Sequence, residues 1–147
     1  MSETIIKALW DYFLTCPLMG NQKINVDYLP PECGRDGVEY CISPTPDTEI
    51  LNRFVSGSTM RQYTFTLGSV NDYGTDTLQN IDNCGFYEAM AAWLEVQTQT
   101  KHFPTMPPGK RAMQIYALTP VYLLNAQETA GKYQIPCRIV YFQKGER

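Results

Sequence analysis

Two segments of this chain alternate between apolar and polar side chains, and they constrain the fold more than any other feature of the sequence. Within residues 59–67, Tyr63, Phe65 and Leu67 fall on one side of an extended strand and polar residues on the other. Residues 133–142 alternate in the same way. A period of two is typical of a strand with one buried face. Both segments are therefore predicted to be strands of a sheet that is covered on one face.

The last of these strands carries two further signals. Its polar side becomes apolar at Val140 and Phe142, so we expect this end of the strand to be covered on both faces. Pro136 lies in the middle of the strand and has no N–H to donate. Since proline is confined to edge strands or bulges, the strand is predicted to lie at an edge or to be bulged there.

The remaining pattern predicts two helices and four or more further strands. Residues 2–16 are predicted to form a helix with Ser2 as its N-cap. The negative charge of Glu3 in the first turn interacts favourably with the helix dipole, and the helix is expected to end before Pro17. Strands are expected at 24–28, 38–42, 48–55 and 59–67, followed by a loop at 68–74. A helical turn is expected from Thr75, and after an interruption at Asn83-Cys84-Gly85 a helix at 85–98. A loop at 102–109 then leads to a strand that runs from 113–118 across Pro120 into 121–124. Ser56-Gly57-Ser58 predicts a hairpin between two of the strands.

The predicted order is α-β-β-β-β-α-β-β. Short connections favour antiparallel pairing, and amphipathic helices need a sheet face to cover. The sequence thus predicts an α+β fold: a single, mainly antiparallel sheet packed against two helices. Residues 1–147 show no linker or repeat and are expected to form one domain.

Composition narrows the classes of function. The net charge is −3 and the twelve Lys and Arg residues are scattered singly, unlike the basic stripe of a nucleic-acid-binding protein. No apolar run is long enough for a membrane span, and Met1 to Thr4 lack the basic region of a secretory signal. We therefore expect a cytoplasmic protein without membrane contact. Only 18% of residues are charged, which weakly favours self-association.

Candidate catalytic and ligand residues are few. His102 is the only histidine and is expected at a helix end, where a cation suits the dipole. Asp72, Asp76 and Asp82 are predicted to cap the second helix, because they lack the spacing of a calcium loop. Gly109-Lys110-Arg111 lacks the upstream glycine of a phosphate-binding loop. We expect no catalytic, cofactor-binding or metal-binding residue, and no enzyme.

The five cysteines form no metal-binding motif. Cys16, Cys33, Cys41, Cys84 and Cys137 are irregularly spaced and are predicted to be free thiols that act as small hydrophobes. A Cys33–Cys41 disulfide is the alternative, if the two flank one turn. A zinc site is not expected with one histidine and no paired thiols.

Two groups of residues suggest contact with a partner. Lys101, His102, Lys110 and Arg111 flank one loop and are expected to be its solvated rim, with phosphate or an acidic protein as the alternative. The chain also has ten tyrosines, a residue enriched at protein interfaces. Several must lie in the core, but together they favour an interaction protein over an enzyme.

A series of short motifs resembles a known family. In order they are IIKAL at 5–9 with Tyr12 and CPL at 16–18, INVDYL at 24–29, YCISPTP at 40–46, RQYTF at 61–65, LQNI at 78–81 with GFYE at 85–88, and YQIPCR at 133–138. They span almost the whole chain, from Ile5 to Tyr141. In this order they resemble a family of small structural proteins of tailed phages and prophages of Gram-positive bacteria, described as minor capsid or tail-terminator-like proteins.

The resemblance implies a structural role in the virion. Tail-terminator proteins have a small α+β fold and form rings, usually hexameric, that cap the tail tube and offer a docking face to the head. The implied partners are other copies of the chain, the tail-tube protein and head-completion or connector proteins, with at most transient, non-specific DNA contact in the lumen. Assembly would take place in the cytoplasm of a bacterial host. Residues 69–75 and 103–110 are the loops expected to make these contacts.

Two alternatives remain at the level of sequence. One keeps the phage context but makes the chain a head–tail connector or a minor capsid protein. The other is a small-molecule-binding domain with a Tyr- and Cys-lined pocket between sheet and helices.

Overall fold

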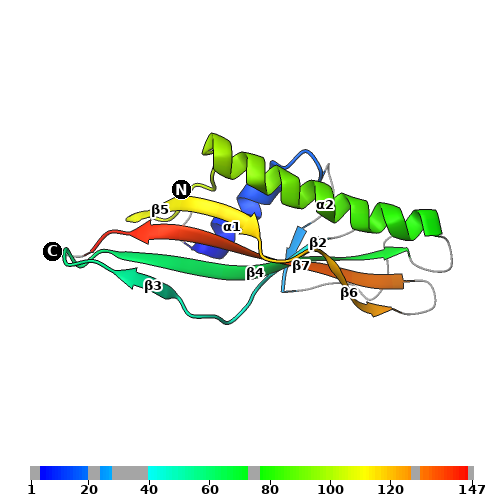
Figure 1. The fold of residues 1–147 in the computed structure, drawn as a ribbon, viewed down its shortest axis with the longest axis horizontal. Coiled ribbons are helices and arrows are strands. Elements are labelled where there is room, and N and C mark those ends of the chain that lie inside the picture. Colours follow the sequence, from blue (N-terminus) through cyan, green and yellow to red (C-terminus); the bar gives the residue numbers. More distant parts are fainter. Residues whose placement is uncertain (1–3, 20–23, 28–39, 73–76, 127–129, 146–147) are drawn as a thin grey trace.

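The structure is a computed structural model, which describes residues 4–19, 24–27, 40–72, 77–126 and 130–145. Two helices and seven strands follow one another in the chain (Figure 1). They are α1 (Ile5–Leu14), β1 (Ile24–Val26), β2 (Tyr40–Pro44), β3 (Ile50–Arg53), β4 (Thr59–Asp72), α2 (Thr77–Thr100), β5 (Lys110–Ala117), β6 (Tyr122–Ala126) and β7 (Ala130–Gln143).

All seven strands belong to one sheet, whose main path is β1-β2-β4-β7-β5. β3 pairs with β4 beyond the end of β2, and β6 pairs with β7 beyond the end of β5. β1 runs parallel to β2, and every other pair is antiparallel. The predicted α+β class, with a single, mainly antiparallel sheet and two helices, is confirmed.

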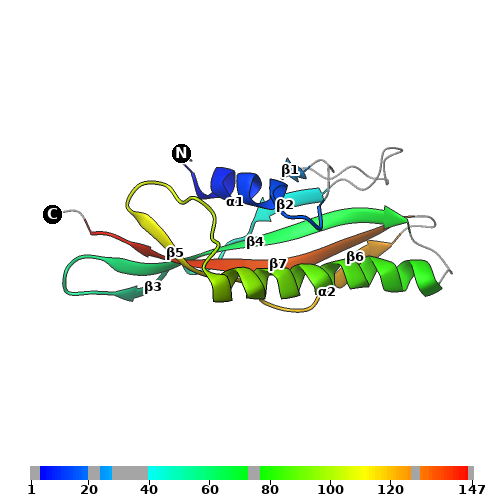
Figure 2. The ribbon, with the colours of Figure 1, turned by 90° about the horizontal axis from the view of Figure 1, so that it is seen from above.

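Both helices pack into one core on the same face of the sheet, where the Tyr12 ring of α1 lies 5.3 Å from the Trp93 ring of α2. In Figure 2, which is seen from above, β4 and β7 run between the two helices. The period-two pattern determines this face: odd-numbered residues in the middle of β4 and β7, such as Phe65 and Ile139, are buried in the core that the helices share. The two helices contribute similar sets of buried side chains to the core: Leu9, Tyr12 and Phe13 from α1, and Tyr87, Met90 and Leu94 from α2. In the two figures the sheet is longer than this cover, and the β3–β4 hairpin extends beyond both helices.

α1 begins later than predicted. The N-cap is Thr4, whose Oγ1 accepts a hydrogen bond from the Lys7 N–H at 3.2 Å. Ser2 and Glu3, the expected cap and first-turn acid, lie outside the described residues. The helix ends at Leu14, before Pro17 as predicted, and Trp10 ties it to β1 by donating its indole N–H to the Ile24 carbonyl at 2.8 Å.

The predicted loop at 68–74 was wrong, because β4 continues to Asp72. β7 supplies a partner for every residue of this extension, from Gly68 opposite Gln134 to Asp72 opposite Ala130. Gly68 permits the close approach of the strands: a Cβ at this position would lie 3.2 Å from the Tyr133 carbonyl oxygen. The predicted hairpin between β3 and β4 is confirmed, with Gly57 in its turn at a φ of 92°.

The predicted break in the second helix was also wrong. α2 runs without interruption through Asn83, Cys84 and Gly85. Asn83 is buried and its amide donates to the Tyr133 hydroxyl at 3.4 Å, while Tyr87 and Met90 anchor the following turn in the core. Tertiary packing on both sides of Gly85 therefore outweighs the low helix propensity of glycine.

The C-terminal strands differ from the prediction in two ways. The expected single strand across Pro120 is divided into β5 and β6, which both pair with β7. Pro136 is not in an edge strand, because β7 has partners on both sides. Its carbonyl accepts from the Leu118 N–H at 2.8 Å, just after β5 ends. A strand residue directs N and C=O to the same side, so the donor that proline lacks would face the break between β5 and β6.

We predict that Gly85→Ala stabilises the protein by about 0.5–1 kcal/mol, because alanine has the higher helix propensity and nothing lies within 4 Å of the added Cβ. Urea denaturation followed by circular dichroism measures the change. Gly68→Ala is the matched variant and should destabilise, since its Cβ would press on the Tyr133 carbonyl. Equal effects of the two substitutions would contradict this account of the helix.

Candidate functional site

His102 lies where the sequence predicted, just beyond the C-terminus of α2. Its carbonyl accepts from the Tyr12 hydroxyl at 2.8 Å, and its Nδ1 shares a 3.0 Å hydrogen bond with the Thr100 hydroxyl. The side chain is exposed and lines a hollow between α1 and the residues that follow α2. The polar side chains that line this hollow with His102 come from Asp11, Tyr12, Thr15, Gln97 and Thr105, and the two hydrogen bonds named above join His102 to Tyr12 and Thr100.

The three predicted capping acids do not gather at one place that the structure describes. Asp72 is the last residue of β4, Asp82 is exposed in α2, and Asp76 lies outside the described residues. Among the residues that are described, no group of three His, Cys, Asp or Glu side chains is placed to hold a metal ion.

The four cysteines that the structure describes lie in or beside the core. Cys16, Cys41 and Cys137 are buried, Cys84 is half-buried, and all four are free thiols; Cys33 lies outside the described residues. With Cys41 free, the alternative Cys33–Cys41 disulfide is not formed. Burial raises the pKa of the Cys16 thiol above its ordinary value and raises that of Cys137 to about 12. Both thiols therefore stay protonated and unreactive near neutral pH.

Most of the described tyrosines belong to the core. Tyr12, Tyr40, Tyr87, Tyr133 and Tyr141 are buried, and burial raises the pKa of Tyr12 and Tyr87 above the ordinary range. Tyr63 and Tyr116 are half-buried, Tyr122 is exposed, and Tyr28 and Tyr73 lie outside the described residues. The tyrosine content thus reflects the core more than an interface.

Of the two loops predicted to make contacts, one belongs largely to a strand. Residues 69–72 form the end of β4, with Ser69 and Asn71 buried, and residues 73–76 lie outside the described part. The Pro-rich segment 103–109 is irregular, as predicted. Met106 holds it against the core, and Thr105 and Pro108 are exposed.

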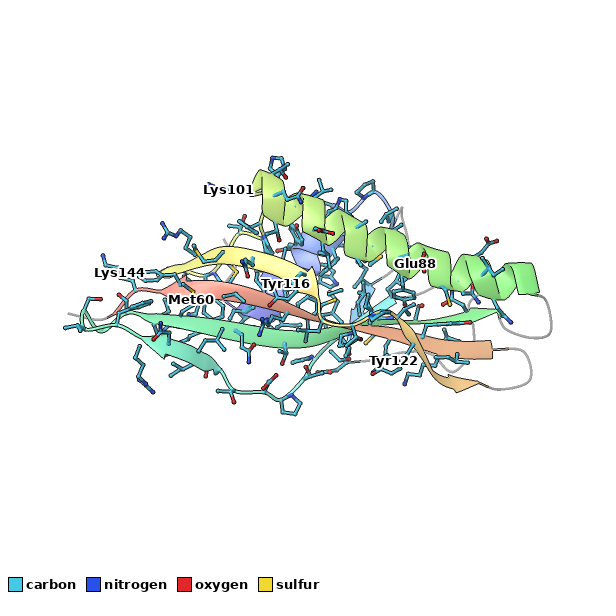
Figure 3. All side chains as sticks on the ribbon, in the orientation of Figure 1. Met60, Glu88, Lys101, Tyr116, Tyr122 and Lys144 are labelled. Atoms are coloured by element: carbon cyan, nitrogen blue, oxygen red, sulfur yellow. The ribbon has the colours of Figure 1, made fainter. Side chains whose placement is uncertain are left out.

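Strand register gathers four cations at one end of the sheet. Arg53 of β3 pairs with Thr59, Thr59 with Gln143, and Gln143 with Lys110 of β5. Arg111 and Lys144 follow Lys110 and Gln143 in the chain, and the Lys144 N–H donates to the Gly109 carbonyl at 2.9 Å. We refer to Arg53, Lys110, Arg111 and Lys144 as the basic end. Lys101 lies just after α2, at the start of the segment whose other end carries Lys110 and Arg111, so these residues flank one loop as predicted (Figure 3).

The same end of the sheet exposes apolar side chains. Leu51, Phe54 and Val55 project from the β3–β4 hairpin and are 45%, 40% and 99% exposed. We refer to these three residues as the apolar tip. The Phe54 ring lies 6.2 Å from that of Phe142, over which the Arg111 guanidinium sits at 5.6 Å. The ring contact between Phe54 and Phe142 therefore holds the tip against β7.

A groove separates α2 from the crossing between β5 and β6. Tyr87 and Ile135 are buried at its floor, Ala91 and Ala92 line the helix side, and residues 116–121 line the sheet side. Its volume is about 680 Å³. Glu88 and Glu95 of α2 are exposed along it, and none of its lining residues is basic. We refer to it as the α2 groove. No cysteine lines it, in contrast to the Tyr- and Cys-lined pocket of the small-molecule alternative.

The face of the sheet opposite the helices carries a cluster of polar side chains. The Arg138 guanidinium donates from Nε to the Tyr116 hydroxyl at 2.5 Å and from a terminal nitrogen to the Gln62 side-chain oxygen at 2.7 Å. Val140, between Gln62 and Gln114 in register, is 8% exposed, and Phe142 is half-buried. The prediction that this end of β7 is covered on both faces is thus confirmed for Val140. On this face no described helix lies over Val140, and its polar neighbours Gln62 and Gln114 flank it instead.

The free edge of β5 is closed by α2. The Thr98 hydroxyl accepts from the Ile115 N–H at 3.0 Å and donates to the Ile115 carbonyl at 2.7 Å. These are the edge groups that an added strand would pair with. A partner is therefore not expected to extend the sheet at this point of β5.

Neither a family model nor a curated protein matches this chain. In the described residues no helix is both long and apolar enough to span a membrane. The sequence does not reveal the basic end, because Arg53 and Lys110 are far apart in the chain. Only the register of β3, β4, β7 and β5 brings them together.

We predict that Thr98→Val costs about 1–3 kcal/mol of stability, because two partly buried backbone groups of Ile115 lose their partner. Thr100→Val is the control: its hydroxyl donates to the Val96 carbonyl on an exposed turn, so its removal should change stability by less than about 0.5 kcal/mol. Urea denaturation measures both values. Unchanged hydrogen exchange at the Ile115 amide in Thr98→Val would contradict the closed edge.

We predict that stability falls as pH rises above about 9, the ordinary pKa of a thiol. The folded chain keeps Cys137, Tyr12 and Tyr87 protonated at pH values where the unfolded chain releases these protons. Unfolding then releases protons, and each such group lowers stability by about 1.4 kcal/mol per pH unit within its window. Urea midpoints between pH 7 and 10.5 test this, and Cys137→Ala should show the shallower decline.

Proposed function

We propose that this chain is a structural protein of a tailed phage or prophage: a tail terminator or completion protein that forms a ring at the head-proximal end of the tail. In this proposal its partners are other copies of itself, the tail-tube protein and the head-completion or connector proteins. It acts in the virion after assembly in the host cell, is not an enzyme, and touches DNA at most transiently.

The observation that carries the proposal is the end of the sheet that extends past both helices. There the apolar tip stands beside the basic end. Exposed apolar side chains that lie close together mark protein–protein contact sites more often than ordinary surface. The ordered motifs between Ile5 and Tyr141 supply the phage context, and the α+β fold agrees with what that resemblance implies.

The test is deletion of the gene from the phage or prophage that encodes it, followed by electron microscopy of the particles. A terminator stops growth of the tail tube and presents it to the head. Its loss should therefore give filled heads without tails, together with tubes of abnormal and uneven length. A plasmid copy of the wild-type gene should restore joined particles.

The outcomes separate the related roles. Unjoined heads beside tails of uniform, normal length would replace the terminator with a head–tail connector, and tailed particles with defective heads would indicate a minor capsid protein. Normal, joined and infectious particles in the deletion strain would overturn a structural role in the virion.

A further inference from the structure

We propose that the apolar tip of one copy seats in the α2 groove of the next copy, flanked by pairs between the basic end and the acidic residues of α2. This contact deepens the proposed function by naming the surfaces through which copies associate. It rests on that function only for the closure of the contacts into a ring.

The apolar tip has the form of an inserting element. Val55 is almost fully exposed at the turn of the hairpin, and Leu51 and Phe54 add apolar surface behind it. The Phe54–Phe142 contact and the hydrogen bonds from Phe54 N to the Ser58 carbonyl and from Gly57 N to the Phe54 carbonyl hold the turn in shape. A preorganised apolar projection loses little entropy on binding, so its burial contributes efficiently to affinity.

The α2 groove has the matching form. On the helix side of the groove, Ala91 and Ala92 have small side chains that leave room for an inserted group. Leu118 and Val121 line the opposite side. Leu118 lies in the turn between β5 and β6 and is 42% exposed. Small side chains on one wall and exposed aliphatic side chains on the other give a receptor for one or two apolar side chains.

Charge makes the two surfaces complementary. The tip lies at the same end of the sheet as the four cations of the basic end, while Glu88 and Glu95 line the groove. None of these six side chains forms an ion pair with another described residue of the same chain. Opposite charges on the two surfaces favour encounter and set orientation, and like charges disfavour pairing of two tips or two grooves. A contact between the tip of one copy and the groove of another therefore pairs the opposite charges of the two surfaces.

The positions of the two surfaces determine the kind of assembly. Lys144 marks the basic end and Glu88 the groove, and Figure 3 shows them far apart along the long axis. One copy therefore cannot join its own tip to its own groove. A contact between two different surfaces is heterologous, and such contacts propagate from copy to copy into a ring or an open filament rather than stopping at a symmetric dimer.

The experiment uses the full chain and two surface variants. Phe54→Ser with Val55→Ser removes the apolar surface of the tip, and Ala92→Arg fills the groove with a cation that repels the basic end. Each has a matched control: Val26→Ser with Val96→Ser removes two apolar side chains that are exposed elsewhere, and Ala89→Arg adds the same cation to α2 at an exposed position that does not line the groove. Thermal unfolding confirms that all four remain folded.

Solution mass is measured by sedimentation equilibrium over a wide concentration range at low and high salt. The wild type should self-associate, more weakly at high salt, since screening weakens the charge pairs. Each surface variant should raise the dissociation constant at least about tenfold, the loss expected when a central contact is removed, and each control should change it by less than about threefold.

Mixing the two surface variants is the decisive step. The tip variant keeps an intact groove, and the groove variant keeps an intact tip. A one-to-one mixture should therefore form a heterodimer, although neither variant associates alone, and growth should stop there because the other two surfaces are blocked. A symmetric contact does not produce this result.

Three results would overturn the inference: a wild type that remains monomeric at every concentration, surface variants that associate as the wild type does, or a mixture that forms no heterodimer. None of these results depends on the phage. If the contact fails these tests but the deletion strain makes abnormal tails, the proposed function stands and the inferred contact does not. If copies associate as expected but the deletion strain makes normal particles, the contact stands and the proposed function does not.

Discussion

The pairing of β4 with β7 is the interaction on which the rest of the structure depends. The two strands pair along their whole length, from Thr59 opposite Gln143 to Asp72 opposite Ala130. β2 and β3 attach to the free side of β4, and β5 and β6 to the free side of β7. A slip of one residue in this central ladder would move Phe65 and its neighbours from the covered face to the open one. The register therefore sets both the core and the positions of all five outer strands.

The sequence predicts the elements whose pattern is local. The alternation in β4 and β7 and the apolar face of α1 identify these three correctly, because each pattern follows from one residue's relation to its near neighbours. The errors arose where distant contacts decide. Gly68 and the polar residues after it form a strand because β7 pairs with them, and Gly85 remains helical because Asn83 and Tyr87 are held in the core. Local propensity carries no information about such partners.

The candidate surfaces follow the same division. The sequence places Phe54 and Val55 near a hairpin turn, yet their link to Phe142 and to the cations of the basic end exists only in the folded sheet. The α2 groove combines residues of a helix and of a strand crossing that follow from no single segment. Tyrosine content, in contrast, does not locate any surface. An amphipathic ring serves a core as well as an interface, and composition does not distinguish the two.

The central ladder also has a consequence for how the protein is made. Its paired residues are 58 to 84 positions apart in the chain. Contacts between distant segments slow folding because a long loop must close before they form. On one side β4 pairs with β2 and β3, which precede it in the chain, but its other side has no partner until β7 has been synthesised. The core of a growing chain therefore stays incomplete until β7 is available, and its apolar residues are exposed to aggregation until then.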